Sequence, residues 1–446
     1  MKFETGLGHR RNVVFFPEAS FGAALNCITL AQALRGQGVL CRFITREGFA
    51  GVFRDYGFEE HVLPPTVASD SGYWAEFLER KVPIFDAPPM AQLEHLVAPT
   101  YRAALSEVIA TEASLKAALD LLQPDLIVID DVIMYPAIMT HGAPWVRVMS
   151  TAENEIPGPG VPPPMSGLGQ GDNFGPFTEA ARRILGPVHD DYMTFRADAG
   201  VPALPPTVFM DESPYLNLVI APSPLRIDRD TALPADRFLM MEHNVRTEPP
   251  FAVPDLPRNA GPLVYVSFGS LGALDTGFMR RLISVFADVP ARFLVNVGAR
   301  LDAYSKVPDN VHLQYWFPQP SVVAHCDLFI HHGGLSSTCE ALLNGAPSLV
   351  LPYFWDGHDT ARRIEEAGLG RALSRCGLQI EHLGPAIESL LADTDLKVRL
   401  SATAARLRQG PATTEATARI LALLALPKTV PTPVATATHD QTRSFS

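Results

Sequence analysis

The sequence has no apolar run long enough to cross a membrane. None of its apolar stretches approaches the length of about 18 residues that a spanning helix requires, and the first residues, MKFETGLGHRR, hold no hydrophobic signal segment. A net charge of −12 at pH 7 leaves no broad basic field, so nucleic acid and anionic membrane surfaces are poor partners. These absences predict a cytoplasmic protein that binds small neutral or cationic molecules.

Cysteine is scarce as well. The five cysteines among 446 residues are odd in number and scattered, and most lie inside apolar runs, as reduced core thiols do. Their spacing matches no metal-binding pattern. The sequence therefore predicts neither a disulfide framework nor a metal site.

What the sequence does have is an alternation of apolar strands and amphipathic helices, which occurs twice along the chain. This rhythm is typical of α/β domains with doubly wound parallel sheets. We predict a first domain over residues 1–240, a linker rich in proline and polar residues over 241–260, and a second domain over 261–404. Residues 427–446 have few large apolar side chains, and we expect a disordered tail there.

The most informative segment runs from Trp316 to Gly370. An apolar strand over 328–330 is followed by His-His-Gly-Gly and then by a helix pattern over 337–344 that Gly345 ends. A strand that enters a helix through glycines directs backbone N–H groups and the positive end of the helix dipole at one point, and such a point attracts phosphate. The alternative is an ordinary buried strand and helix with an incidental glycine pair.

Side chains that could complete a nucleotide site surround this turn. They offer a hydrogen-bond donor, two hydroxyls, a carboxylate for ribose hydroxyls, a flat ring for a base and an amide for the edge of that base. In the same order, these residues are His332, Ser336, Ser337, Glu340, Trp316 and Gln319.

The spacing of these residues resembles that of the GT-B inverting glycosyltransferases, the family of plant and bacterial UDP-sugar and dTDP-sugar transferases for small molecules. The resemblance covers roughly residues 12–425. It implies two Rossmann-like domains facing across a cleft, with acceptor binding in the first, donor binding in the second, and a C-terminal helix over 405–426 that packs back on the first. The donor-binding residues that it implies are Gly269, Ser270, Trp316, Gln319, His332, Gly333, Gly334, Ser336, Ser337, Glu340 and Asp356.

The resemblance assigns separate parts of the donor to these residues. Trp316 and Gln319 would hold the base, and Glu340 the ribose. His332 and the two serines would hold the diphosphate, together with Gly269 and Ser270 at the end of the segment LVYVSFGS. Asp356 would hold the sugar hydroxyls.

Two positions depart from the family pattern. Ser336 stands where the family usually has asparagine, and Gly357 stands where a sugar-reading glutamine or histidine usually follows the aspartate. The sequence therefore does not identify the transferred sugar.

The family's catalytic base is also missing. Most members carry a histidine after the first strand, and it takes the proton from the acceptor; here Ala23 occupies that position. In one hypothesis a carboxylate replaces it, and the candidates are Asp130, which matches the acidic partner of the absent histidine, the adjacent Asp131, and Glu18 in the turn itself. In a second the acceptor needs no protein base. In a third the protein binds nucleotide sugar but transfers nothing.

The acceptor site is expected near residues 151–176, which are rich in glycine and proline and follow the apolar segment that ends at Met149. Open α/β sheets bind ligands at this edge, although a plain surface loop is the alternative. Nearby apolar residues would form either a soft pocket or core: Met134, Tyr135, Met139, Met149 and Met165. Asp359 is the natural N-cap of the next helix.

The predicted function is transfer of a sugar from a UDP- or dTDP-sugar to a small, hydrophobic natural-product acceptor. No metal ion or other cofactor is required in this interpretation, because the helix end, His332 and the serines stabilise the leaving diphosphate. The predicted partners are these two small molecules, with neither nucleic acid nor membrane, in a monomer or a homodimer. A sugar-nucleotide epimerase and a non-catalytic auxiliary protein are the alternatives.

Overall fold

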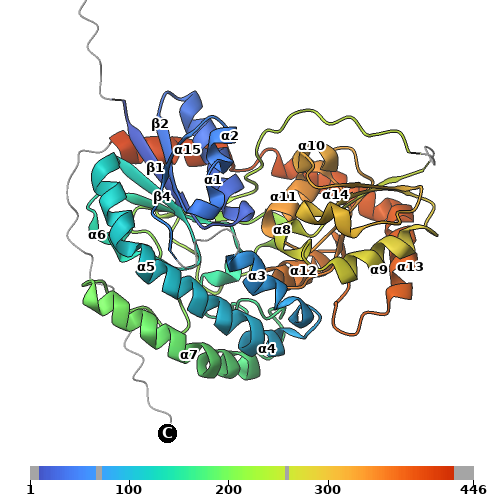
Figure 1. Ribbon diagram of the computed structural model, residues 1–446, viewed down its shortest axis with the longest axis horizontal. Coiled ribbons are helices and arrows are strands. Elements are labelled where there is room, and N and C mark those ends of the chain that lie inside the picture. The colour runs from blue at the N-terminus through green and yellow to red at the C-terminus, as the bar shows by residue number, and fades with distance from the viewer. Residues whose placement is uncertain (1–9, 67–72, 257–260, 426–446) are drawn as a thin grey trace, which may run out of the picture.

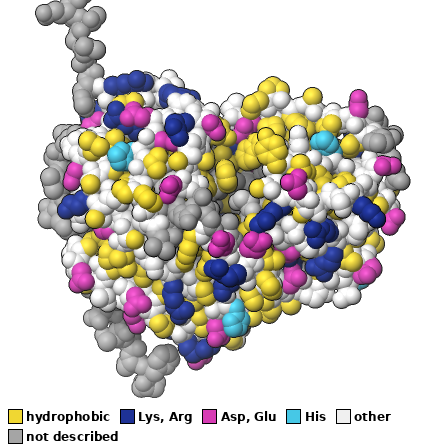
Figure 2. Space-filling model, viewed as in Figure 1, with side chains coloured by type: hydrophobic (Ala, Val, Ile, Leu, Met, Phe, Trp, Pro, Cys, Tyr) yellow, Lys and Arg dark blue, Asp and Glu magenta, His cyan; other side chains and the backbone are white. Residues whose placement is uncertain are grey.

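The structure is a computed structural model that describes residues 10–66, 73–256 and 261–425; the predicted tail lies outside them. The described chain forms two parallel sheets. The first has the strand order β3-β2-β1-β4-β5-β6-β7 and the second the order β10-β9-β8-β11-β12-β13, and the two domains lie side by side (Figure 1). This arrangement confirms the α/β prediction of two doubly wound sheets. The surface is indented where the domains meet (Figure 2).

The first sheet is covered on both faces by helices, as its strands require. Its central strands are fully buried, and alternate residues of β1 pack into two different apolar clusters, Val13 and Phe15 in one, Val14 and Phe16 in the other. The strands are β1 (Asn12–Pro17), β2 (Leu40–Thr45), β3 (Glu59–Val62), β4 (Leu126–Asp130), β5 (Trp145–Met149), β6 (Leu216–Ile220) and β7 (Phe238–Met241). The longer helices are α1 (Phe21–Gly36), α5 (Ala98–Leu122) and α7 (Gly175–Asp198).

The second sheet repeats this architecture with shorter strands. They are β8 (Leu263–Ser267), β9 (Arg292–Asn296), β10 (Val311–Gln314), β11 (Leu328–His331), β12 (Ser348–Val350) and β13 (Gly370–Ala372). Its principal helices are α9 (Thr276–Phe286), α11 (Leu335–Asn344), α12 (Gly357–Glu366), α13 (Leu383–Ala392) and α14 (Thr394–Leu407).

Each sheet reverses its strand order at one point, and each predicted cluster of functional residues lies there. The reversal in the first sheet is at the pair β1 and β4, where Pro17 pairs with Asp130, and in the second at β8 and β11, where Ser267 pairs with His331. Ligands of open α/β sheets bind at such switch points, beyond the carboxyl ends of the strands. The topology thus positions Glu18 and Asp130 in one domain and the glycine-rich turn in the other.

The C-terminal segment returns to the first domain, but not as one helix over 405–426. α14 ends at Leu407, and α15 (Thr413–Ala425) begins after a short break that contains Gly410 and Pro411. In this break the Pro411 carbonyl accepts from the Glu242 N–H at 2.7 Å. α15 then lies against α1 (Figure 1), with Ile420 buried in the core of the first domain.

In the described part of the chain, no helix combines the length and apolar character that a membrane crossing requires.

Replacing Ile420 with alanine should lower the free energy of unfolding by about 2–5 kcal/mol, because the side chain is fully buried between α15 and the first sheet. Urea denaturation would measure the change. Leu121→Ala is the control, since Leu121 is 70% exposed and its loss should change the value by less than about 0.5 kcal/mol. Equal effects of the two substitutions would contradict the packing role of α15.

Candidate functional site

The turn between β11 and α11 has a geometry that only glycine allows. Gly333 has φ +92°, and a Cβ atom there would lie 2.6 Å from the carbonyl oxygen of Gly357. The His331 Nδ1 atom accepts from the Gly333 N–H at 3.1 Å and fixes the turn. α11 therefore starts abruptly, and the N–H groups of its first turn have no helical carbonyls to bind. This helix end suits an anion.

His332 lies against this helix end as a neutral imidazole. A Cβ atom on Gly334 would be 2.5 Å from its Nε2 atom, and one on Gly269 would be 3.2 Å from its Cε1 atom. Burial lowers the pKa of His332 to about 4, although a hydrogen bond with the backbone of Ser267 opposes the change. Near neutral pH this side chain can donate a hydrogen bond to a phosphate without carrying a charge. Ser270 is exposed beside Gly269 at the start of α8 (Gly269–Gly272).

The first domain contacts the same helix end. Asn26 of α1 donates from Nδ2 to the Ser336 Oγ atom at 3.2 Å, and the backbone carbonyl of Asn26 accepts from the Asn244 amide at 3.0 Å. No sequence pattern indicates the contact between Asn26 and Ser336, because these residues are 310 positions apart. The predicted phosphate turn therefore faces α1 and the segment that leads into it.

The residues predicted to bind the base and the ribose lie together, but two of them already have protein partners. Trp316 is 38% exposed, with its ring centroid 6.2 Å from that of Phe21. Gln319 donates from Nε2 to Glu340 at 2.7 Å and to Ser337 at 3.0 Å. The Trp316 ring is available to a base, whereas the Gln319 amide is held by its neighbours.

Glu340 has a cationic partner that sequence reasoning missed. It is 1% exposed, and its Oε1 atom lies 3.2 Å from the Arg246 Nη1 atom. Arg246 comes from the segment between the domains and also pairs with Glu248. In the sequence, Arg246 is a single arginine among prolines and polar residues, and no motif identifies it as the partner of Glu340. A carboxylate can accept several hydrogen bonds, so a ribose bound here would share Glu340 with Arg246.

The missing sugar-reading side chain has a steric cause. A Cβ atom on Gly357 would lie 2.6 Å from the carbonyl oxygen of His332, so no larger residue fits. Asp356, immediately before it, has its pKa raised to about 7 by burial and by Asp359. The preceding residue, Trp355, has φ +53°. The two glycines, Gly333 and Gly357, pack backbone to backbone, and neither position has room for a side chain that could contact a ligand.

The prediction that Asp359 caps a helix is wrong. α12 begins two residues earlier, at Gly357, and the Asp359 carboxylate instead accepts from the Met165 N–H at 2.6 Å and the Gly167 N–H at 2.8 Å. Both donors belong to the segment rich in glycine and proline. The carboxylate therefore holds this loop of the first domain against the second.

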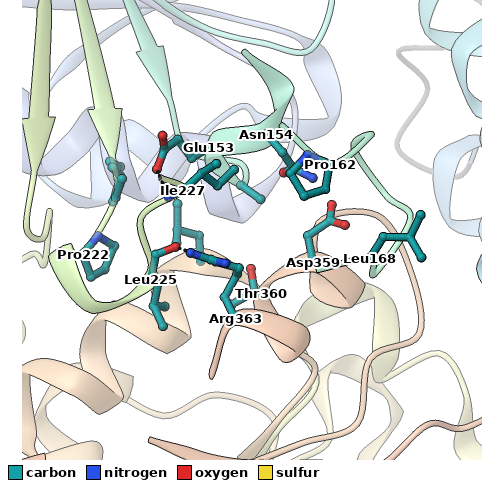
Figure 3. Close-up of a pocket in the computed structure, with 14 residues that line it drawn as sticks. Glu153, Asn154, Pro162, Leu168, Pro222, Leu225, Ile227, Asp359, Thr360 and Arg363 are labelled. Atoms are coloured by element: carbon teal, nitrogen blue, oxygen red, sulfur yellow. Dashed lines mark hydrogen bonds between the residues drawn. The ribbon is translucent and has the colours of Figure 1, made fainter. Parts of the chain in front are cut away.

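The docked loop and α12 enclose a small apolar cavity between the domains (Figure 3). Figure 3 shows Asp359, Thr360 and Arg363 of α12 facing Asn154 and Pro162 of the first domain. The methionines and the tyrosine considered for an acceptor pocket line neither this cavity nor the second one described below. Met134, Tyr135, Met149 and Met165 are at most 5% exposed and Met139 packs against them, so these residues belong to the core.

A second cavity, of about 220 Å³, lies in the first domain beneath the same loop. Tyr101 and Phe209 line it with their rings stacked 4.1 Å apart, and Glu155 and several prolines complete its wall. Sequence reasoning missed this cavity because its residues come from α5, α7, the loop over 151–176 and the segments that follow β4 and α7.

Three carboxyl groups were considered as the base, and burial raises the pKa of all three. Burial raises the pKa of Glu18 and that of Asp130 to about 7, with a further increase from Asp131 for the first and from Glu18 for the second. The Glu18 N–H donates to the Asp130 carbonyl at 2.7 Å. One Asp130 oxygen accepts from Ser150 at 2.9 Å, and the other is buried with no partner among the described residues.

Asp131 is held differently. Its carboxylate lies 3.3 Å from the Arg46 guanidinium and accepts from the Ile133 N–H at 3.2 Å. Arg46 is 6% exposed and also lies 3.5 Å from Glu107. An ion pair this deeply buried is typical of a structural link, because removing one partner leaves an uncompensated charge.

Known proteins resemble the chain in sequence and in structure. Residues 280–423 match the family described as "Erythromycin biosynthesis protein CIII-like, C-terminal domain". NDP-glycosyltransferase YjiC of Bacillus subtilis is 24% identical over 388 residues, which cover 85% of this chain and 89% of that protein. The calicheamicin glycosyltransferase CalG4 has a TM-score of 0.67 at 22% identity over 93% of this chain and 98% of its own. The Streptomyces sp. SF2575 glycosyltransferase SsfS6, complexed with thymidine diphosphate, has a TM-score of 0.62 at 18% identity over 93% of this chain and 100% of its own.

Gly357→Ala should destabilise the protein by at least about 1–3 kcal/mol, because the new methyl group would overlap a backbone oxygen that cannot move away easily. Thermal and urea denaturation would measure the loss. Gly36→Ala is the matched control, since a Cβ atom there meets nothing within 4 Å and alanine is favoured at the end of a helix. Normal stability of Gly357→Ala would contradict the close approach of the two turns.

Proposed function

Since the chain belongs to the GT-B glycosyltransferases of the natural-product type, we propose that it transfers a sugar from a UDP- or dTDP-sugar to a small, hydrophobic acceptor with inversion at the anomeric carbon. The observation that carries this proposal is the contact between the two switch points. The helix end suited to a diphosphate meets α1 through Ser336 and Asn26, and α1 follows directly on the turn that holds Glu18.

In this proposal the second domain stabilises the leaving diphosphate. The first turn of α11 offers backbone N–H groups, and the neutral His332 offers a further donor. Donors that are already oriented are worth most where charge develops, so this site could act without a metal ion. SsfS6 is described as complexed with thymidine diphosphate, which supports a nucleotide sugar as the donor.

Glu18 is the proposed base. It is only half-buried, whereas Asp130 is 5% exposed and bound to Ser150 and Asp131 is paired with Arg46. The charge of Glu18 also acts on Asp356 in the second domain and on Tyr101 in the acceptor cavity. Glu18 is therefore close enough to both residues to interact with them electrostatically, and in this proposal the attacking hydroxyl passes near it.

The proposed step is a single displacement. The acceptor oxygen attacks the anomeric carbon, Glu18 takes the hydroxyl proton, and the bond from that carbon to the diphosphate oxygen breaks with its electron pair on the leaving group. A carboxylate of ordinary pKa would be a weak base, but a pKa near 7 is suited to general base catalysis at neutral pH.

The experiment that tests the function is mass spectrometry of products from UDP-glucose or dTDP-glucose with a library of phenols, alcohols, amines and thiols. Addition of a hexose that is lost in His332→Ala supports the transferase. Nucleotide binding that His332→Ala abolishes, without any transfer, would favour the non-catalytic hypothesis suggested by Ala23. Conversion of the donor sugar without an acceptor would favour the epimerase.

Glu18→Gln should lower kcat by about 10²–10⁴-fold with little change in donor affinity, because the amide cannot accept the proton. Glu112→Gln is the matched control: Glu112 is also half-buried with a pKa raised to about 7, but it lies on α5 and lines neither cavity. Steady-state kinetics with a saturating donor would compare them. Full activity of Glu18→Gln would transfer the role of base to Asp130 or to the acceptor itself.

The pH dependence of kcat/KM should reflect the ionisation of Glu18. Because the folded pKa of Glu18 is raised to about 7, its basic form is lost as the pH falls through this value. We expect kcat/KM to fall by about tenfold per pH unit below 7 and to be constant above it. The residual activity of Glu18→Gln should lack this acidic limb. A wild-type profile that is flat between pH 5 and 8 would exclude Glu18 as the base.

A further inference from the structure

The second cavity contains a carboxyl group with an unusual environment. Glu155 ends a short 3₁₀ helix (Glu153–Glu155) after β5 and lines the cavity, and its Oε1 atom is buried with no hydrogen-bond partner among the described residues. Glu153, two positions earlier, pairs with Arg229 at 2.7 Å. Glu155 has no corresponding cation in the described structure.

The charges that act on Glu155 are negative. Burial and the carboxylates of Asp359 and Asp356 raise its pKa to about 8. Asp359 is satisfied by the backbone N–H groups of Met165 and Gly167. Asp359 and Asp356 of the second domain thus act on Glu155 in the wall of the cavity. A buried carboxylate is normally paired with a cation, but no ion pair joins Glu155 to a cation among the described residues, although the exposed Arg182 lines the same cavity.

The rest of the cavity is apolar. Tyr101 of α5 stacks on Phe209, and Pro157 and Pro205 form further parts of the wall, while the exposed Arg182 of α7 lines the cavity as well. The volume of about 220 Å³ exceeds the roughly 150 Å³ that holds a benzene molecule. The cavity therefore has room for a ring system with a short substituent.

A bound cation would stabilise the carboxylate of Glu155 more than a neutral group would. A hydroxyl can satisfy the free oxygen of Glu155, but it leaves the repulsion among the three carboxyl groups unchanged. A protonated amine would donate a hydrogen bond to the same oxygen and would replace repulsion with attraction, in surroundings where charge interactions are stronger than in water.

We propose that the acceptor carries a protonated amine that binds the carboxylate of Glu155, with its apolar ring system against Tyr101 and Phe209. This inference rests on the proposed transferase function, and it adds the chemical class of the acceptor. Pairing with the amine orders the acceptor before transfer. The hydroxyl that receives the sugar then extends from the cavity toward Glu18, whose charge acts on Tyr101.

Calorimetry with three probes of equal shape tests the proposal: 2-(naphthalen-2-yl)ethylamine, 2-(naphthalen-2-yl)ethanol and 2-naphthylacetic acid, each in the presence of UDP and, separately, dTDP. At pH 7.5 the amine should bind at least about tenfold more tightly than the alcohol, and the acid most weakly. Glu155→Gln should remove the preference, and the control Glu112→Gln should keep it. Equal affinities of amine and alcohol for the wild-type protein would overturn the proposal.

The pH dependence of binding distinguishes an ion pair from simple packing. Among the described residues, the titratable and charged groups around Glu155 include Asp356 just before α12, Asp359 of α12, Tyr101 of α5 and Arg182 of α7. Because Glu155 has a pKa raised to about 8, it must lose a proton to pair with the amine. The ratio of amine to alcohol affinity should therefore rise between pH 6 and 8 in the wild-type protein and stay constant in Glu155→Gln. A constant ratio in both proteins would contradict the ion pair.

The donor is the other possible source of an amine. Binding of dTDP-glucose and of dTDP-4-amino-4,6-dideoxyglucose should be equally sensitive to Glu155→Gln if the acceptor brings the charge. If Glu155→Gln weakens the binding of the amino-sugar donor but not that of dTDP-glucose, the amine does not belong to the acceptor and the assignment is overturned. Transfer to neutral phenols without any amine preference would refute this inference and leave the proposed function intact, whereas amine binding without transfer to any acceptor would refute the function alone.

Discussion

The backbone contact between Gly333 and Gly357 is the constraint on which the donor side of the cleft depends. Each glycine occupies a place where the Cβ atom of any other residue would lie 2.6 Å from a carbonyl oxygen of the opposite turn. The contact brings the starts of α11 and α12 together, and with them His332 and Asp356. In the proposed function, the sites for the diphosphate and for the sugar thereby become neighbours, as a nucleotide sugar requires. The cost is the side chain at position 357, where nothing larger than glycine fits.

Burial of acidic groups dominates the rest of the cleft. Glu18, Asp130, Asp356 and Glu155 all have pKa values raised to about 7 or 8, and in each case burial is the first cause. Lysine and arginine offset few of these charges, apart from Arg147 acting on Asp130 and Arg46 acting on Glu18. A cleft of this kind can supply a base near neutral pH without histidine, and it disfavours anionic acceptors.

Several of the polar contacts that join the two domains lie at the site. Asp359 holds the acceptor loop through two backbone N–H groups, and Asn26 meets Ser336 at the phosphate turn. Gln92 binds the His358 ring at 2.9 Å and the Tyr353 carbonyl at 3.0 Å. Since each contact joins an acceptor-side element to a donor-side element, movement between the domains would change both halves of the site together.

The sequence by itself determined the architecture and the donor turn. Alternating strands and helices predict two parallel sheets because a strand buried on both faces must be apolar throughout, and the His-His-Gly-Gly turn is local, so its spacing can be read from the chain. The missing base at Ala23 could be read in the same way. The prediction of one C-terminal helix was wrong because Gly410 and Pro411 interrupt it.

Only the tertiary structure decided which partners these residues have. Arg246 pairs with Glu340, Arg46 pairs with Asp131, and Asp359 binds the backbone of Met165. The residues of these three pairs are 85–194 positions apart in the sequence. Periodicity and spacing carry no information about such pairs. Whether an acidic group is paired, as Asp131 is with Arg46, or lines a cavity, as Glu155 does, depends on how distant segments pack.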